Sequence, residues 1–293
     1  MADRTSPTVR RRRLGYELRL LREAASLTGE AVAEQMGWSD SKVSRIETGK
    51  ISVTWGDVSD LLDVYGVSDT AVRDALIALA REAKKEGWWH PYTDLLKRPY
   101  STYIGLEAAA EVLRVYEPLT IPGLLQTPAY ARAVIATNTR ELTDTEIERL
   151  IEVRLRRQEI ALSGDDPLRL HVILDEAALR RETGGPAIMH EQLERLVQAA
   201  AHPRTRLQVL TFGQGSHVGM AGNLTVFTFP DTDNAADVAF IDTGIGSLFV
   251  ERRAEVQAAR DTFDELTAQA LSPQNTLALL TQFSAAYQQR TTK

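Results

Sequence analysis

Residues 14–83 carry apolar side chains at helical spacing in five short runs, separated by brief connections. Five helices are predicted, over about 14–25, 28–36, 40–48, 54–65 and 72–83. Thr28 can cap the second helix, and either Ser39 or Asp40 can cap the third. Gly37 permits the left-handed conformation that ends the second helix in a tight turn. Helices this short, joined so closely, favour a compact all-α domain of residues 14–85.

The offsets within this domain are more specific than the number of helices. Ala33 is small where two helices must cross closely, Gly37 follows four positions later, and Val43 and Ile46 continue the pattern. This is the steric skeleton of a helix-turn-helix. The stretch LGYELRLLREAASLTGEAVAEQMGWSDSKVSRIETGK resembles the DNA-binding domain of phage-repressor-like (xenobiotic-response-element family) regulators. The resemblance covers roughly residues 12–75 and implies that residues 40–48 form a recognition helix in the major groove.

The same resemblance assigns roles to individual positions. It places Asp40, Ser41, Ser44 and Arg45 toward base edges, although Asp40 is better suited to capping the helix. It makes Thr28, Ser39, Lys42 and Lys50 candidates for phosphate contacts. The guanidinium of Arg45 is the best candidate for direct readout, because it can bond both acceptors of guanine. Arg22 and Glu47 match a pair that ties the first helix to the third in this family.

Gly29 departs from the family pattern, since most relatives carry glutamine at the start of the second helix. The loss of that side chain either weakens DNA binding or is compensated by the backbone amide of Gly29 at the helix N-terminus. Just before the first helix stand four arginines, Arg10, Arg11, Arg12 and Arg13. We expect residues 1–13 to form a basic arm that contacts DNA. The alternative is a solvated basic tail.

The net charge of the chain, −6, argues at first against a nucleic-acid partner. Residues 4–50, however, hold ten Lys/Arg and six Asp/Glu, whereas residues 91–293 hold twenty against twenty-six. The basic segment therefore coincides with the helix-turn-helix pattern. The chain has no cysteine and no long apolar run, which excludes a disulfide framework and thiolate metal sites and favours a cytoplasmic protein.

Residues 88–293 predict a second, α+β domain. Helical patterns fall at about 104–116, 127–137, 143–162, 175–182 and 186–201, and two closing helices at 252–270 and 273–289. Strand patterns such as LRLHVIL, RLQVLTF and GNLTVFTF, followed by DVAFID and SLFVE, predict a mixed, mostly antiparallel sheet of about five strands. Six aromatic residues within 88–116 indicate a domain-interface core or a ligand groove. The arginines of helix 143–162 suggest a solvated face, or less readily a second nucleic-acid surface.

Several segments of this domain are similar to the C-terminal domain of actinobacterial, WhiJ-type, antitoxin-like regulators. They are LRVYEPLTIPGLLQTPAYARAVI, VRLRRQEI, LDEAALRRETGGPAIMHEQLERL and LQVLTFGQGSHVGMAGNLTVFTFP. In that family the domain accompanies a helix-turn-helix. The resemblance implies a small partner protein, encoded nearby, that the regulator binds.

Patterns typical of catalysis are weak. The glycine-rich stretch Gly213–Gly219 lacks the lysine and the strand–helix setting of a phosphate loop. His217, next to Ser216, is the one histidine in a site-like loop. No cofactor or metal is expected. We therefore predict a non-enzymatic, sequence-specific DNA-binding regulator that forms a homodimer. The alternative is an antitoxin-like protein that sequesters a small partner and uses DNA binding for autoregulation. An enzyme under the control of a DNA-binding domain is a third, weaker hypothesis.

Overall fold

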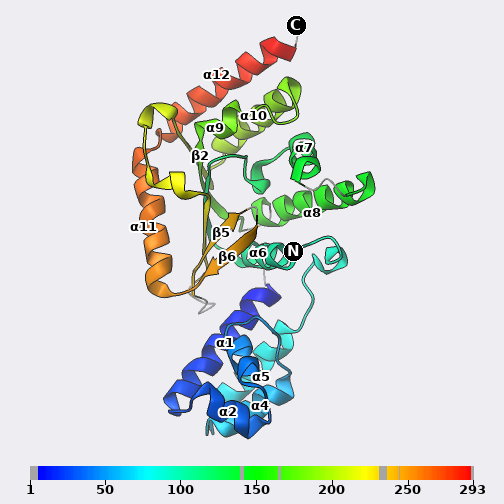
Figure 1. Ribbon diagram of the computed structural model, residues 1–293, viewed down its shortest axis with the longest axis vertical. Coiled ribbons are helices and arrows are strands. Elements are labelled where there is room, and N and C mark those ends of the chain that lie inside the picture. Colours follow the sequence, from blue (N-terminus) through cyan, green and yellow to red (C-terminus); the bar gives the residue numbers. More distant parts are fainter. Residues whose placement is uncertain (1–5, 139–141, 164–165, 231–235, 244, 292–293) are drawn as a thin grey trace.

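The structure is a computed structural model that describes residues 6–138, 142–163, 166–230, 236–243 and 245–291. Two domains lie end to end along the long axis, with the N-terminal helices at one end and the α+β domain at the other (Figure 1). The five predicted N-terminal helices are confirmed. They are α1 (Pro7–Ala24), α2 (Gly29–Met36), α3 (Asp40–Glu47), α4 (Trp55–Val64) and α5 (Thr70–Ala83).

Local chemistry explains the boundaries of the short helices. The Thr28 hydroxyl accepts a hydrogen bond from the Ala31 amide at 3.1 Å, which caps α2. Gly37 ends α2 with φ at +63°, a conformation that glycine adopts without steric cost. Ser39 occupies the N-cap of α3 without a capping hydrogen bond from its side chain. Val32, Val43 and other apolar side chains of the five helices share one buried cluster.

The first helix begins earlier than predicted. Ser6 caps α1 and Pro7 occupies its first turn, a favoured combination at a helix start. The expectation of an extended basic arm is therefore wrong over residues 7–13, while residues 1–5 lie outside the described part of the chain. Thr8 and Val9 are buried, and a Cβ added at Gly105 would approach the Thr8 hydroxyl to 2.3 Å. The close approach of α1 to Gly105 shows that the N-terminal end of α1 packs into the α+β domain.

The α+β domain contains a six-stranded mixed sheet in the order β3-β2-β1-β4-β5-β6. The pairs β1–β2 and β2–β3 are parallel, and the other three pairs are antiparallel. The strands are β1 (Val112–Glu117), β2 (Arg169–Asp175), β3 (Thr205–Leu210), β4 (Leu224–Thr228), β5 (Val238–Thr243) and β6 (Gly246–Val250). The helices are α6 (Arg98–Ala109), α7 (Pro128–Asn138), α8 (Asp144–Leu162), α9 (Glu176–Arg180), α10 (Pro186–Ala200), α11 (Arg253–Gln269) and α12 (Pro273–Thr291), with short 3-10 turns η1 (His90–Tyr92), η2 (Gly123–Leu125), η3 (Phe212–Gln214) and η4 (Val218–Ala221).

Strand β1 is absent from the sequence prediction, which places one helix over residues 104–116. The backbone of Ala110 turns extended and ends α6, and Val112–Glu117 then pairs with β2 on one side and β4 on the other. A central position in the sheet gives β-branched residues such as Val112 and Val115 good packing, which overrides a helical spacing of apolar residues. The prediction of about five strands was therefore one short, while the fold class is confirmed.

Helices cover both faces of the sheet. Alternate residues of β2 show the division: Val172 and Leu174 join a large cluster with α10 and α12, whereas Ile173 joins Phe263 and Leu266 of α11. Trp89 packs with Ile104 and Val153 in a smaller cluster beneath α6 and α8. The aromatic-dense segment thus supplies core side chains. None of the described helices is both long and apolar enough to cross a bilayer.

Candidate nucleic-acid interface

Helix α3 presents one face to solvent and one to the core. Val43 and Ile46 are buried, whereas Ser41, Ser44 and Arg45 are exposed. This division follows from helical periodicity, because residues three apart lie on the same side. The side chain of Asp40 lies outside what the structure describes, so its predicted role stays a prediction. The exposed serines and Arg45 form the polar surface that the resemblance assigned to base contacts.

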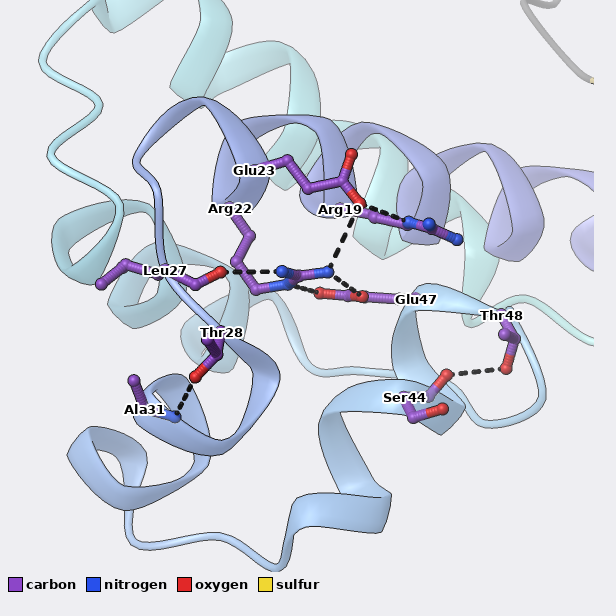
Figure 2. Close-up of polar contacts among 9 residues, drawn as sticks. All are labelled: Arg19, Arg22, Glu23, Leu27, Thr28, Ala31, Ser44, Glu47 and Thr48. Atoms are coloured by element: carbon purple, nitrogen blue, oxygen red, sulfur yellow. Dashed lines mark hydrogen bonds and ion pairs between the residues drawn. The ribbon is translucent and has the colours of Figure 1, made fainter.

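An ion pair fixes α3 against α1, as Figure 2 shows. Arg22 Nε and Nη2 donate to the two carboxylate oxygens of Glu47 at 2.6 and 3.0 Å, and Nη1 donates to the Leu27 carbonyl at 2.8 Å. The hydrogen bond to Glu47 is the main cause of a raised pKa of Arg22. The predicted tie between the first and third helices is therefore present. It also anchors the connection that leads into α2.

A glycine completes this contact, and sequence reasoning missed it. A Cβ added at Gly15 would lie 2.4 Å from the Ile46 carbonyl oxygen and 2.6 Å from that of Glu47. Only glycine lets α1 approach the end of α3 so closely. A glycine inside an otherwise helical apolar pattern was the available signal.

The Arg45 guanidinium is held by its own helix. Its Nε donates to the Ser41 carbonyl at 3.1 Å, and the Arg45 side chain makes no other hydrogen bond or ion pair with the described residues. The terminal nitrogens therefore remain available at the exposed surface. This arrangement can present a bidentate donor to guanine.

The residues that are predicted to contact phosphates surround α3. Thr28, Ser39 and Lys50 are exposed, and Lys42 is half-buried with its ammonium 3.5 Å from the centre of the Trp38 ring. The hydroxyl oxygens of Ser39 and Ser41 lie 3.4 Å apart. At Gly29 an added Cβ would meet nothing closer than a Val43 methyl at 4.0 Å, so packing does not require glycine there.

The four arginines at residues 10–13 point largely into the protein. Arg10 pairs with Glu82 at 2.8 Å, and Arg12 pairs with Glu251 at 3.2 Å while lying over the Phe249 ring. Arg11 donates to the Thr8 hydroxyl at 3.4 Å. These contacts correct the idea of an arm that reaches around DNA. Arg10 and Arg12 connect α1 to α5 and to the end of β6, and DNA contact by the four arginines stays a prediction.

The arginines of helix α8 form contacts within the protein. Arg157 is buried and donates two hydrogen bonds to the buried Glu107, at 2.7 and 2.6 Å. Arg149 pairs with Asp94 at 2.7 Å, and Arg154 bonds the Gln126 side chain. The expectation of a solvated face is wrong for Arg157, since its partner lies fifty positions earlier in the chain.

The residues of the enzyme hypothesis come together only in part. His217 Nε2 lies 3.6 Å from Asp175 Oδ2, at the carboxyl end of β2. Ser216 is exposed, and its side chain forms no hydrogen bond with the described residues. The Ser–His–carboxylate arrangement is therefore not assembled in this geometry.

Comparison with known proteins agrees with this division into two domains. Residues 100–282 match the family described as "Domain of unknown function (DUF5753)", which is more than half of the chain. The chain belongs to the DUF5753 family. Residues 13–76 of this DUF5753 protein match a family described as "Helix-turn-helix domain". That match supports a DNA-binding regulator rather than an enzyme. Searches of curated proteins and of solved structures found no match.

Proposed function

We propose that this protein is a sequence-specific regulator of transcription that reads double-stranded DNA with α3. The observation that carries the proposal is the exposed face of α3 with Ser41, Ser44 and Arg45, held in one orientation by the Arg22–Glu47 pair. A recognition helix must reach base edges from a fixed position, because small displacements lose bidentate hydrogen bonds. The helix-turn-helix match supports the same assignment.

The proposed interface divides its tasks. Arg45 reads guanine, and Ser41, Ser44 and Asp40 contact neighbouring base edges. Around them, the side chains of Thr28, Ser39, Lys42 and Lys50 and the backbone amide of Gly29 contact phosphates. Neutralised phosphates release counterions, so affinity falls steeply with salt while base discrimination persists.

We infer that the protein acts as a homodimer. One small helix-turn-helix module contacts too few base pairs to select a site in a genome, whereas two modules read half-sites about 34–36 Å apart. In this proposal the DUF5753 domain supplies the dimer contact. It also receives the signal, which the resemblance to WhiJ-type actinobacterial regulators suggests is a small partner protein.

The contacts between the domains support a route for such a signal. Arg98 of α6 donates to the carbonyl of Lys50, just after α3, at 3.0 Å, and Arg12 of α1 pairs with Glu251. A partner that favours one arrangement of the domains changes DNA affinity by its difference in affinity for the two arrangements. Co-expression with the neighbouring small protein tests this step. A stable complex without any DNA binding would favour the antitoxin-like alternative.

An electrophoretic mobility shift with the DNA upstream of the protein's own gene tests the core proposal. We expect retarded complexes at a salt concentration at which random DNA of equal length does not bind. Arg45→Ala should abolish this preference, while Arg156→Ala on the far exposed face of α8 should retain it. Equal affinity for specific and random DNA in the unmodified protein contradicts the proposal.

A further inference from the structure

A large cleft runs between the helix-turn-helix and the DUF5753 domain. Its volume is about 1,980 Å³, and its walls come from α1, the segment after α3, α6, the strands β4–β6, and α11. Figure 1 shows the N-terminal end of α1 directed toward β6 and α6. Because residues of these elements line the cleft, it lies at the junction of the domains. The cleft therefore joins the DNA-reading domain to the domain without an assigned activity.

The walls of this cleft are strongly basic. Ten Lys/Arg and four Asp/Glu line it, although the whole chain carries a net charge of −6. One of the four acids, Glu47, is already paired with Arg22 on the side of α3. An excess of cations gathered on the inner walls of an acidic protein points to a negatively charged ligand.

Three arginines of the cleft are close together and short of carboxylates. Arg11, Arg12 and Arg98 line it, and the pair between Arg12 and Glu251 is the one ion pair that they form with a carboxylate of the described residues. Burial, followed by the charges of Arg98 and Arg12, lowers the pKa of Arg11. The next residue, Arg13, also lines the cleft and forms no ion pair with a carboxylate of the described residues.

Polar atoms of these arginines are left without partners. Arg11 Nε, Arg12 Nη1 and Arg13 Nε are buried and form no hydrogen bond in the described structure. A buried guanidinium normally satisfies its donors, because an unmet charged donor costs free energy of desolvation. The positive charges of these guanidinium groups are therefore only partly compensated within the protein, which favours an anion in the cleft beside them.

Apolar side chains also line the cleft. Phe249, Ile241 and Val256 line it beyond Arg12, and the Arg12 guanidinium lies 5.6 Å from the centre of the Phe249 ring. A ligand that fits both parts carries a charged group and an apolar or aromatic body. Arg11, Arg12 and Arg13 are half-buried, which suits a small molecule better than duplex DNA, whose phosphates meet exposed side chains.

We propose that this cleft binds a small phosphate-bearing molecule, with Arg11, Arg12 and Arg98 holding its phosphate groups. Guanidinium groups pair bidentately with phosphate oxygens, and three of them match an anion with more than one negative charge. Arg13 adds further positive charge beside this group. The apolar body of the ligand lies along β6 and α11.

The position of the site gives it a regulatory role, a step that rests on the proposed DNA-binding function. Arg98 donates to the Lys50 carbonyl, and a Cβ added at Gly49 would lie 2.9 Å from the Cα of Arg12. The arginines that hold the phosphate therefore contact the segment that leaves α3. A ligand that draws Arg12 and Arg98 together changes the placement of α3 relative to the DUF5753 domain.

Isothermal titration calorimetry of the full chain with inorganic pyrophosphate, at low ionic strength and without DNA, tests the binding site. We expect saturable binding that Arg11→Gln and Arg98→Gln each weaken at least about tenfold. Arg156→Gln, at an exposed position outside the cleft, is the matched control and should bind as the unmodified protein does. Circular dichroism of each variant verifies that it is folded.

Titration with citrate tests whether the cleft prefers phosphate groups to carboxylate groups. Pyrophosphate binding that is tighter than citrate binding and depends on Arg11 supports the proposal. Equal binding to the control and cleft variants, or no binding of pyrophosphate, overturns it. Loss of DNA affinity in Arg11→Gln without pyrophosphate binding would likewise overturn it and assign these arginines to DNA. Because calorimetry uses no DNA, a failed mobility shift leaves this result intact, and the two proposals fail separately.

Discussion

Each domain joins two of its helices by an arginine–carboxylate pair, and the two pairs differ in their surroundings. Arg157 and Glu107 have side chains only 5% and 2% exposed, and the rings of Tyr100 and Tyr103 lie beside the guanidinium. Arg22 and Glu47 are 13% and 9% exposed, at the margin of the helical domain. The first pair stabilises a core, while the second orients a surface helix. The same chemistry therefore carries fold stability in one domain and interface geometry in the other.

The largest effect is expected from breaking the buried pair. Glu107→Ala removes the partner on α6 and leaves the buried Arg157 of α8 charged and unpaired, so the free energy of unfolding should fall by about 3–5 kcal/mol. Urea denaturation followed by circular dichroism measures this loss. Glu159→Ala, which removes the exposed partner of Arg156, is the control and should change stability little. Equal losses in both variants would contradict the distinction drawn between the two kinds of pair.

A second carboxylate of the α+β domain, the half-buried Glu117, forms no ion pair with the described residues and extends this comparison. Burial, and then the charge of Asp242, raise the pKa of Glu117 from about 4.5 to about 8. The folded state thus binds a proton that the unfolded state releases, so stability decreases as the pH rises from about 4.5 to about 8. Between pH 6 and pH 8.5 the free energy of unfolding should fall by about 1–3 kcal/mol. Glu117→Gln should lose less over this range, and an identical pH profile for both proteins would disprove the assignment.

Breaking the Arg22–Glu47 pair should lower the free energy of unfolding by less than breaking the Arg157–Glu107 pair. Glu47→Ala removes two charged hydrogen bonds that are partly screened by solvent, so we expect a loss of about 1–2 kcal/mol in the free energy of unfolding. Because Arg22 then no longer holds α3, specific DNA affinity should fall more than stability alone explains. Mobility shifts at a temperature where the variant remains folded measure this. Unchanged affinity would separate the pair from the DNA interface.

The smallest effect concerns Gly29, where the family pattern has glutamine. The open space around Gly29 accommodates a side chain. Gly29→Gln should add one phosphate hydrogen bond and raise DNA affinity by roughly threefold. Gly29→Ala controls for the improved helix propensity alone. If both variants bind equally, the glutamine makes no phosphate contact.

The sequence predicts the helical domain well because its elements depend on local signals. Thr28 as a cap, Gly37 as a left-handed turn and the Arg22–Glu47 tie are all present in the structure. The predictions were wrong where contacts between residues far apart in the sequence determine the structure. Strand β1 forms because β2 and β4 flank it, and Arg157 is buried because Glu107 meets it.

The arginines of residues 10–13 give the clearest case of this limit. Four consecutive basic residues are typical of an exposed arm, yet the DUF5753 domain packs against the start of α1 and draws Arg12 to Glu251. No local sequence pattern predicts an ion pair with Glu251, which lies more than two hundred residues later in the sequence. The cleft between the domains could not be predicted from the sequence for the same reason, because segments far apart in the chain line it.

The central claim is that Arg45 on the exposed face of α3 reads sequence. Its most direct measurement is the ratio of the dissociation constant for random DNA to that for the upstream DNA, determined over a range of salt concentrations by fluorescence anisotropy. The account predicts that Arg45→Ala lowers this ratio by about ten- to a hundredfold at every salt concentration. Lys50→Ala should instead weaken binding to both DNAs equally and reduce the salt dependence. An Arg45→Ala variant whose ratio equals that of the unmodified protein would contradict the account.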